Sequence, residues 1–125
     1  MRTGIITGAS SGMGREFVLQ AAARGELDEI WVIARRAERL EQLQREGSVP
    51  LFVLPLDLTR AESFETYRRI LEQRRPQVTL LVNASGFGKF GRYDEIPLQD
   101  SLDMIDLNCK ALVHITQLTL PYLER

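Results

Sequence analysis

The sequence predicts a single domain of the α/β class with a doubly wound parallel sheet. Short apolar runs alternate with stretches in which apolar residues recur at helical spacing, and this alternation is unbroken along the 125 residues. A glycine-rich turn separates the first apolar run from the first helical pattern. No repeat, low-complexity tract or interdomain linker divides the chain. Apolar strands joined by helical crossovers require a parallel sheet with helices on both faces.

The first half of the chain contains two pairs of strand and helix. Residues 3–7 predict a short buried strand, and helical spacing of apolar residues then continues until Gly25 closes the helix. Residues 29–34 form a second apolar run, followed by a polar helical stretch that ends near Gly47. The apolar positions are Phe17, Val18, Ala21 and Ala22 in the first helix, and Leu40 and Leu43 in the second.

The second half repeats this pattern. Residues 51–54, bounded by prolines, predict a third strand, and residues 78–82 predict a fourth. Between them, Thr59 and Glu62 have the spacing of a capping box, which predicts a helix that begins there. The apolar residues of that helix are Phe64, Tyr67 and Leu71. After a loop, a long helical pattern runs from about Leu98 to the end of the sequence.

Charge and composition favour a small ligand over a large polyanion. Lys and Arg number 16 and Asp and Glu number 17, so the chain lacks the basic face that nucleic acid or an anionic lipid surface would require. No leader sequence and no run of about 20 apolar residues is present, which predicts no membrane contact and a cytoplasmic location. The single cysteine, Cys109, excludes an internal disulfide, and its spacing from His114 argues against a metal or Cys/His site.

The glycine-rich turn carries the main indication of function. Gly8 allows a sharp turn, Gly12 allows the backbone to approach a ligand, and Gly14 allows the helix to pack closely against the strand. The unpaired amide groups and the dipole of the helix that begins here favour a pyrophosphate. Alone, such a turn could also be a simple connection. Its other candidate cofactor-binding residues are Met13 and the potential hydroxyl donors Ser10 and Ser11.

The motif TGASSGMG, with the spacing TGxxxGxG close to the N-terminus, resembles that of the short-chain dehydrogenase/reductase family. The resemblance extends over the whole chain, because Asp57, residues 83–86 and Asn108 follow the turn at fitting intervals. It implies a Rossmann fold with strand order 3-2-1-4, in which a dinucleotide binds between the first and fourth strands. It also implies an oxidoreductase that transfers hydride between a nicotinamide cofactor and a carbonyl or alcohol substrate.

The end of the second strand favours NADP over NAD. An acidic residue is expected here when the ribose of NAD is bound, but the sequence has Ala34, Arg35 and Arg36 instead. A small neutral residue leaves room for a 2′-phosphate, and Arg35 offers a planar set of donors, with Arg36 as a second candidate. Ser11 stands where many NADP-dependent members have a basic residue, so we expect preference and not exclusivity. The alternative is an ordinary solvated start to the next helix.

Two further groups complete the predicted dinucleotide site. The resemblance implies that Asp57 accepts a hydrogen bond from the exocyclic amine of adenine and that Leu58 lines the ring, although Asp57 could simply support the following helix. Residues 83–86 match the family's Asn-Asn-Ala-Gly at the first and last positions. Asn83 is expected to bond to backbone across the sheet. The cofactor is expected to lie close to Ala84, Ser85 and Gly86, a plain turn being the alternative.

Asn108, in the final helix, is the catalytic candidate. With Ala111, Thr116 and Pro121 it resembles the family's fourth-helix pattern, in which the asparagine distorts the helix. The resemblance implies that its backbone carbonyl anchors a water in the proton relay to the active-site lysine. The alternative is an ordinary polar residue inside a helix.

Apolar residues surround most of the final helix. One stripe contains Leu102, Ile105, Cys109, Leu112 and Thr116, while Leu107, Val113, Leu118 and Leu120 lie on other faces. One stripe would suffice to cover a sheet, so the excess predicts a second partner surface. The fourth strand would also be an edge with unpaired backbone groups. We therefore expect a homodimer formed through this strand or through the final helix.

Together these features predict the N-terminal half of an NADP-dependent short-chain oxidoreductase, truncated after the fourth helix and inactive alone. Members of the family are about twice as long and use a serine and a Tyr-xxx-Lys pair. No tyrosine of this sequence is followed by lysine at that spacing. The alternative is a non-catalytic dinucleotide-binding or assembly module, and a third possibility is a folded remnant that binds nothing.

Overall fold

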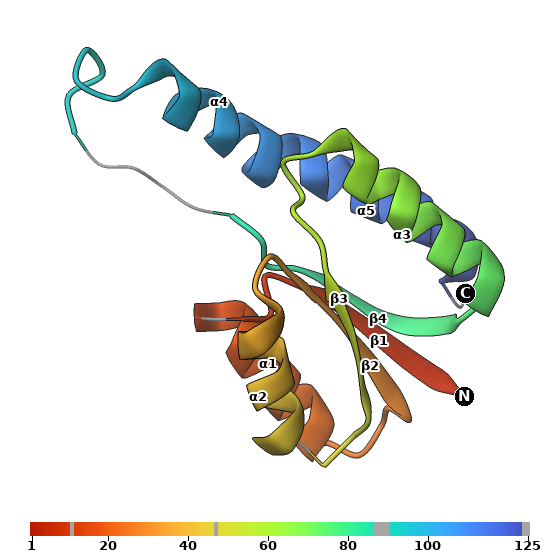
Figure 1. Ribbon diagram of the computed structural model, residues 1–125. Coiled ribbons are helices and arrows are strands. Elements are labelled where there is room, and N and C mark those ends of the chain that lie inside the picture. The colour runs from red at the N-terminus through yellow and green to blue at the C-terminus, as the bar shows by residue number, and fades with distance from the viewer. Residues whose placement is uncertain (11, 47, 87–90, 124–125) are drawn as a thin grey trace.

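The computed structural model describes residues 1–10, 12–46, 48–86 and 91–123 (Figure 1). They form a sheet of parallel strands in the order β3-β2-β1-β4, which confirms the predicted order. The strands are β1 (Arg2–Thr7), β2 (Glu29–Ala34), β3 (Leu51–Pro55) and β4 (Gln77–Asn83). Each strand begins and ends within one residue of its predicted bounds.

Helices cover both faces of the sheet, so the fold is doubly wound as predicted. Figure 1 shows α1 and α2 on one side of the strands, and α3 and α5 on the other. The helices are α1 (Gly12–Ala23), α2 (Ala37–Glu46), α3 (Ala61–Arg74), α4 (Leu98–Ile105) and α5 (Ala111–Thr119).

Each face of the sheet has its own hydrophobic core. Successive strand residues point to opposite faces, so Ile5 packs with the residues of α3 and α5, whereas Ile6 packs with those of α1 and α2. In β2, Ile33 and Val32 divide between the two cores in the same way. Burial on both faces explains why the two central strands, β1 and β2, are rich in apolar residues.

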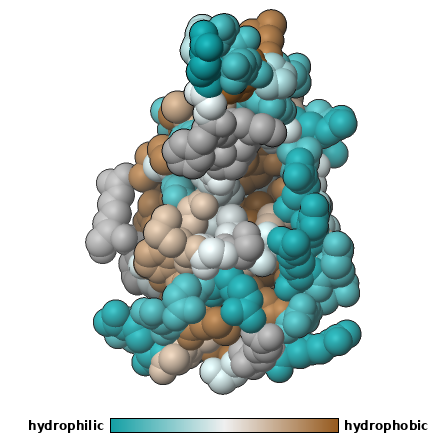
Figure 2. Space-filling model, turned by 90° about the vertical axis from the view of Figure 1, so that its left-hand side faces the viewer, coloured by the Kyte–Doolittle hydropathy of each residue, from teal (hydrophilic) through white to brown (hydrophobic). Residues whose placement is uncertain are grey.

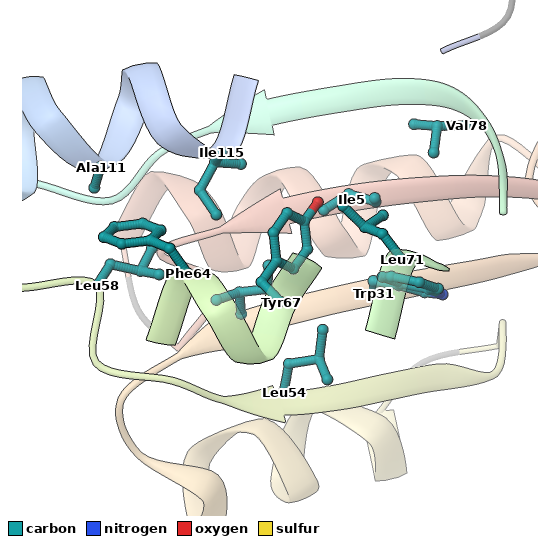
Figure 3. Close-up of a cluster of buried hydrophobic side chains, with 11 residues drawn as sticks. Ile5, Trp31, Leu54, Leu58, Phe64, Tyr67, Leu71, Val78, Ala111 and Ile115 are labelled. Carbon is teal, nitrogen blue, oxygen red and sulfur yellow. The ribbon is translucent and has the colours of Figure 1, made fainter. Parts of the chain in front are cut away.

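Tyr67 lies within the core that α3 and α5 cover (Figure 3). Its hydroxyl oxygen lies 2.7 Å from that of Thr119, and the Thr119 hydroxyl donates to the carbonyl oxygen of Ile115 at 2.6 Å. Since Thr119 uses its hydrogen for Ile115, Tyr67 is the donor to Thr119. Burial raises the pKa of Tyr67 to about 12.

The start of α3 differs from the prediction. The capping box of Thr59 and Glu62 is wrong, because α3 begins at Ala61 and Arg60 precedes it without a side-chain cap. The backbone N–H and the hydroxyl of Thr59 both donate to one carboxylate oxygen of Asp57, at 3.0 and 2.6 Å. Thr59 is thus held by Asp57 in the loop that precedes α3.

The predicted long final helix is present with an interruption. Between α4 and α5 lies a π-helical turn, η1 (Asp106–Lys110), and a 3-10 helix, η2 (Leu120–Tyr122), follows α5. Leu123 then forms a parallel bridge with Val78, so the chain returns to the outer edge of β4. Among the described residues, no helix is long and apolar enough to cross a membrane.

The final helix leaves an apolar face uncovered. The residues of α5 that are buried are Ala111, Ile115 and Thr119. Residues of the stripe identified in the sequence lie outside, and Leu102, Ile105 and Leu112 are 44%, 52% and 47% exposed. Val113 and Leu120 are also exposed. An uncovered face therefore accounts for the excess of apolar residues in this part of the sequence.

Candidate functional site

A cavity of about 540 Å³ opens at the side of the sheet where the strands end. Figure 2 views the molecule from this side, where pale and brown atoms lie between hydrophilic margins. The lining residues come from the turn before α1, the end of β2, the loop after β3, the segment after β4, and the helix from α4 into η1. They are Gly8, Ser10, Gly12, Met13, Ala34, Arg35, Leu56, Asp57, Leu58, Thr59, Ala84, Ser85, Gly86, Asp103 and Leu107.

Most of the residues predicted to bind a cofactor therefore line one cavity. Gly14 does not line it, because it packs beneath the turn against the backbone of Gly8. Arg36 and Asn83 also do not line it. Ser11 lies outside the described residues.

Close backbone contacts fix the turn between β1 and α1. A Cβ atom on Gly14 would lie 2.0 Å from the carbonyl oxygen of Gly8, so no side chain fits where the helix meets the strand. Gly8 has a φ of +65°, and a Cβ there would lie 2.5 Å from the carbonyl oxygen of Ala84. Helix α1 begins at Gly12, which lines the cavity, so the unpaired amide groups and positive end of this helix face it. The arrangement can bind an anionic group.

Thr7, a buried residue at the end of β1, holds the segment after β4 in place. Its hydroxyl oxygen accepts the backbone N–H groups of Ala84 and Ser85, at 3.1 and 3.2 Å. From the sequence, Thr7 was expected only to end a strand and to open the motif TGASSGMG. A hydroxyl at the end of a buried strand beside a glycine-rich turn is the signal that could have identified it.

The side chain of Asn83 bonds to helix α5. Its side-chain amide donates to the hydroxyl of Thr116 in α5 at 3.1 Å, and within the described part of the chain the expected bond to backbone across the sheet is not formed. A small hollow next to the main cavity is lined by Asn83 together with Thr7, Leu58, Ser85, Leu107, Ala111 and Leu112. Asn83 thus ties β4 to α5.

The two arginines after β2 differ in position. Both are exposed and precede α2, but Arg35 lines the cavity and Arg36 does not. The charge of Arg35 also acts on Asp57, across the end of the sheet. The geometry therefore favours Arg35 as the cation that a ligand in the cavity would meet.

Asp57 lies in the loop after β3 with its carboxylate held by neighbours. One oxygen accepts both bonds from Thr59, and the other lies 3.8 Å from Nε of Arg60. Partial burial acts to raise the pKa of Asp57, but the hydrogen bonds from Thr59 and the charges of Arg35 and Arg60 outweigh it and hold the pKa below its ordinary value. Asp57 is therefore a charged acceptor at neutral pH.

Asn108 lies in the π-helical turn η1, at the rim of the same site. A Cβ on Gly86 would lie 2.5 Å from the Oδ1 atom of Asn108, so the asparagine side chain lies directly against the segment after β4. The helix distortion that the resemblance implies is present as the turn Asp106–Lys110.

Four lining residues were not among the predicted site residues. They are Leu56, Thr59, Asp103 and Leu107. Asp103 and Leu107 are four residues apart on the helix that runs from α4 into η1, a spacing that places two side chains on one face. Nothing in the sequence indicated which face of that helix would meet the cavity.

Metal-binding residues are not grouped in the described part of the chain. No three His, Cys, Asp or Glu side chains among the described residues are placed to hold a metal ion. Cys109 is exposed.

Comparisons with known proteins agree with this geometry. A sequence profile described as short chain dehydrogenase matches residues 2–125. Dehydrogenase/reductase SDR family member 7 of Mus musculus is 33% identical over 125 residues, a match that covers 94% of this chain and 36% of that protein. An uncharacterized oxidoreductase of Staphylococcus epidermidis is 25% identical over 122 residues, covering 98% of this chain and 52% of that protein. The chain thus spans about half or less of the length of these relatives.

Solved structures have the same fold. A short-chain dehydrogenase from Sphingobium yanoikuyae in complex with NADPH is 28% identical with a TM-score of 0.83, covering 97% of this chain and 48% of that one. An alcohol dehydrogenase from the archaeon Thermococcus sibiricus complexed with 5-hydroxy-NADP is 30% identical with a TM-score of 0.84, covering 98% and 53%.

Proposed function

Because the chain belongs to the short-chain dehydrogenase/reductase family, we propose that its cavity binds NADP(H) as part of an oxidoreductase acting on a carbonyl or alcohol substrate. The observation that carries the proposal is one cavity that joins the glycine-rich turn, Arg35 and Asp57 at the ends of three parallel strands. A dinucleotide needs these three kinds of partner, for its pyrophosphate, its ribose phosphate and its adenine.

Each part of the cofactor would meet a different element of the cavity. The pyrophosphate would lie at the start of α1, where amide groups and the helix dipole stabilise negative charge. The 2′-phosphate would bond to the guanidinium of Arg35, with Ala34 leaving room beside it. Adenine would lie against Leu58, with Asp57 as acceptor. The segment from Ala84 to Gly86 would carry the cofactor along the end of β4.

Preference for NADP over NAD follows from the charge at the end of β2. Arg35 and Arg36 have no ion-pair partner among the described residues, so their charges remain available to a phosphate. The structural relatives from Sphingobium yanoikuyae and Thermococcus sibiricus, in complex with NADPH and a hydroxylated NADP, are consistent with this preference.

We propose that the 125 residues bind the cofactor but do not complete the catalytic set. When bound, the nicotinamide supplies the hydride that is transferred. The chain's own contribution is to hold the cofactor and to place the backbone of Asn108, in its π-helical turn, where it can anchor a water for proton transfer. Proton donation to the substrate oxygen requires a tyrosine and lysine pair that this sequence does not contain.

The direct test titrates the chain with NADPH and with NADH by isothermal titration calorimetry. We expect both dinucleotides to bind, NADPH more tightly, without oxidation or reduction of added ketones or alcohols. Absence of NADPH binding by a folded chain would overturn the proposal.

A non-catalytic dinucleotide-binding or assembly module is the second candidate, because the 125 residues contain no tyrosine followed by lysine at the required spacing. Determining the coding sequence that follows Arg125 separates the two functions. A continuing frame with a serine and a Tyr-xxx-Lys pair supports the oxidoreductase, and a stop codon supports the module.

We also propose that the chain forms a homodimer, either through β4 or through the exposed apolar face of α4 and α5. Leu102, Ile105, Leu112, Val113 and Leu120 are between 44% and 52% exposed, and this face gains stability when a second copy covers it. Sedimentation velocity at several concentrations tests this, and a concentration-independent monomer would contradict it. A cytoplasmic location stays a prediction from the sequence.

A further inference from the structure

Asp103 is a charged residue of the cavity to which the proposed function gives no role. It lies on α4, is partly buried, and lines the cavity with Leu107. One oxygen of its carboxylate accepts a hydrogen bond from the side-chain amide of Gln99 at 2.8 Å. Its other oxygen has no bonding partner among the described residues. One acceptor of Asp103 thus remains available to a ligand.

Leu58 and Leu107 connect the loop after β3 with the helix that carries Asp103. Leu58 and Leu107 line both the main cavity and the small hollow next to it, and Leu107 packs against the core cluster that contains Leu58. Asp57 precedes Leu58 directly, and Asp103 precedes Leu107 by about one helical turn. The loop after β3 and the helix from α4 into η1 therefore each contribute one leucine and one carboxylate to the lining of the cavity.

Each of the two carboxylates has one oxygen that already accepts hydrogen bonds and one that can accept more. Thr59 occupies one oxygen of Asp57 with two hydrogen bonds, and the other oxygen has only the long contact of 3.8 Å to Arg60. Asp103 likewise has one oxygen bonded to Gln99. A planar ring held in the cavity against Leu58 would therefore have two separate acceptors available, from two different elements.

We propose that Asp103 selects adenine by accepting one N–H of its exocyclic amine while Asp57 accepts the other. This inference rests on the proposed function, which assigns adenine to Asp57 and Leu58. The 6-amino group of adenine has two N–H donors, whereas hypoxanthine and guanine carry a carbonyl oxygen, an acceptor, at that position. A carbonyl there would face two carboxylates without a hydrogen to share, and a site built to accept hydrogen bonds rejects a group that cannot donate them.

The test compares NADPH with its hypoxanthine analogue, in which an oxygen atom replaces the 6-amino group, by calorimetric titration of the 125-residue chain. We expect the analogue to bind about tenfold more weakly or worse, the effect of losing one charged hydrogen bond. Asp103→Asn should reduce this preference severalfold, because an amide can turn its N–H group toward a carbonyl. Asp100→Asn is the matched control, since Asp100 lies on the same helix and does not line the cavity.

Three results would overturn the inference, and they are distinguishable. Equal binding of the two dinucleotides by the unaltered chain removes the role of Asp103 and leaves the proposed cofactor site intact. If Asp103→Asn and Asp103→Ala both retain the full preference for NADPH over the analogue, Asp103 likewise has no role in selecting adenine. Asp103→Ala provides the result if Asp103→Asn does not fold. Failure of the folded chain to bind NADPH at all overturns the proposed function together with this inference.

Discussion

The hydroxyl oxygens of Tyr67 and Thr119 lie 2.7 Å apart in the core between α3 and α5, and the direction of their bond is fixed. Thr119 gives its hydrogen to the carbonyl oxygen of Ile115, so Tyr67 must donate. The two partners are therefore not equivalent. Without Tyr67, Thr119 keeps a partner, whereas without Thr119 the phenol is left buried and unbonded.

This asymmetry predicts different costs for two substitutions. Tyr67→Phe should lower the free energy of unfolding by about 1 kcal/mol, the usual contribution of one hydrogen bond. Thr119→Val should lower it by about 1–3 kcal/mol, because it leaves a buried hydroxyl without a partner. Urea denaturation of both variants measures the difference. Equal losses, or a larger loss for Tyr67→Phe, would contradict the assigned direction of the bond.

Because Tyr67 is buried and its pKa is raised, we also expect the chain to lose stability in alkaline solution. Burial holds its pKa at about 12 in the folded chain, against 10.0 for an ordinary tyrosine. Between these pH values the unfolded chain loses the phenol proton while the folded chain keeps it, so the free energy of unfolding falls as pH rises, by about 3 kcal/mol at most.

Urea denaturation between pH 9 and about 12 checks this expectation. Tyr67→Phe is the control, because phenylalanine has no proton to lose, and its free energy of unfolding should decline less over the same interval. Parallel declines in the two chains would show that Tyr67 does not cause the effect.

Two glycines provide a matched pair for testing the anion site. Gly12 and Gly25 have φ values of +57° and +72°, and a Cβ on either would meet no atom within 4 Å. Alanine at either position should therefore cost a similar amount of stability, about 1–2 kcal/mol. Only Gly12 lines the cavity, so only Gly12→Ala should also weaken NADPH binding, by about tenfold or more.

Thermal melting and calorimetric titration of the two glycine variants separate these effects. Similar melting temperatures with unequal affinities are the expected outcome. If Gly25→Ala weakened NADPH as much as Gly12→Ala did, the loss would follow from stability and not from the site.

Arg35 should determine the preference between the two nicotinamide cofactors. Arg35→Ala removes a charged hydrogen bond of about 1.5–3 kcal/mol, so NADPH should bind roughly ten- to a hundredfold more weakly while NADH is hardly affected. Arg39→Ala is the control, because Arg39 is also exposed but lies in α2 and does not line the cavity. Equal losses of affinity for NADPH and NADH would remove the assignment of Arg35 to the 2′-phosphate.

The strands could be predicted from the sequence because they are short apolar runs, of which the central β1 and β2 are buried on both faces, and their order was implied by the family resemblance. Each strand is a continuous apolar run with clear ends, and a sheet of this class has few possible orders. The start of α3 could not be predicted in the same way. The pattern at Thr59 and Glu62 fits a capping box, but Thr59 donates to Asp57 within the loop and Arg60 is the residue before the helix, an outcome that depends on the path of the loop.

In the candidate site, too, some residues could be placed from the sequence and others could not. Residues adjacent to a strand end, such as Gly8, Arg35 and Asp57, could be placed at the cavity because all parallel strands end on one side. Asp103 could not be placed at the cavity in this way. Its helix is apolar around most of its circumference, and the sequence does not indicate which face turns inward. The buried residues Ala111, Ile115 and Thr119 settle that orientation only through contacts with distant parts of the chain.

The contact of Gly14 with Gly8, and of Gly8 with Ala84, has a consequence for how tightly a ligand can bind. At these points backbone rests on backbone, with distances of 2.0 and 2.5 Å to an added Cβ that exclude any side chain. The orientation of the amide groups is therefore fixed when the domain folds, and an arriving anion does not have to order them. Such preorganisation moves the entropic cost of building the site from binding to folding.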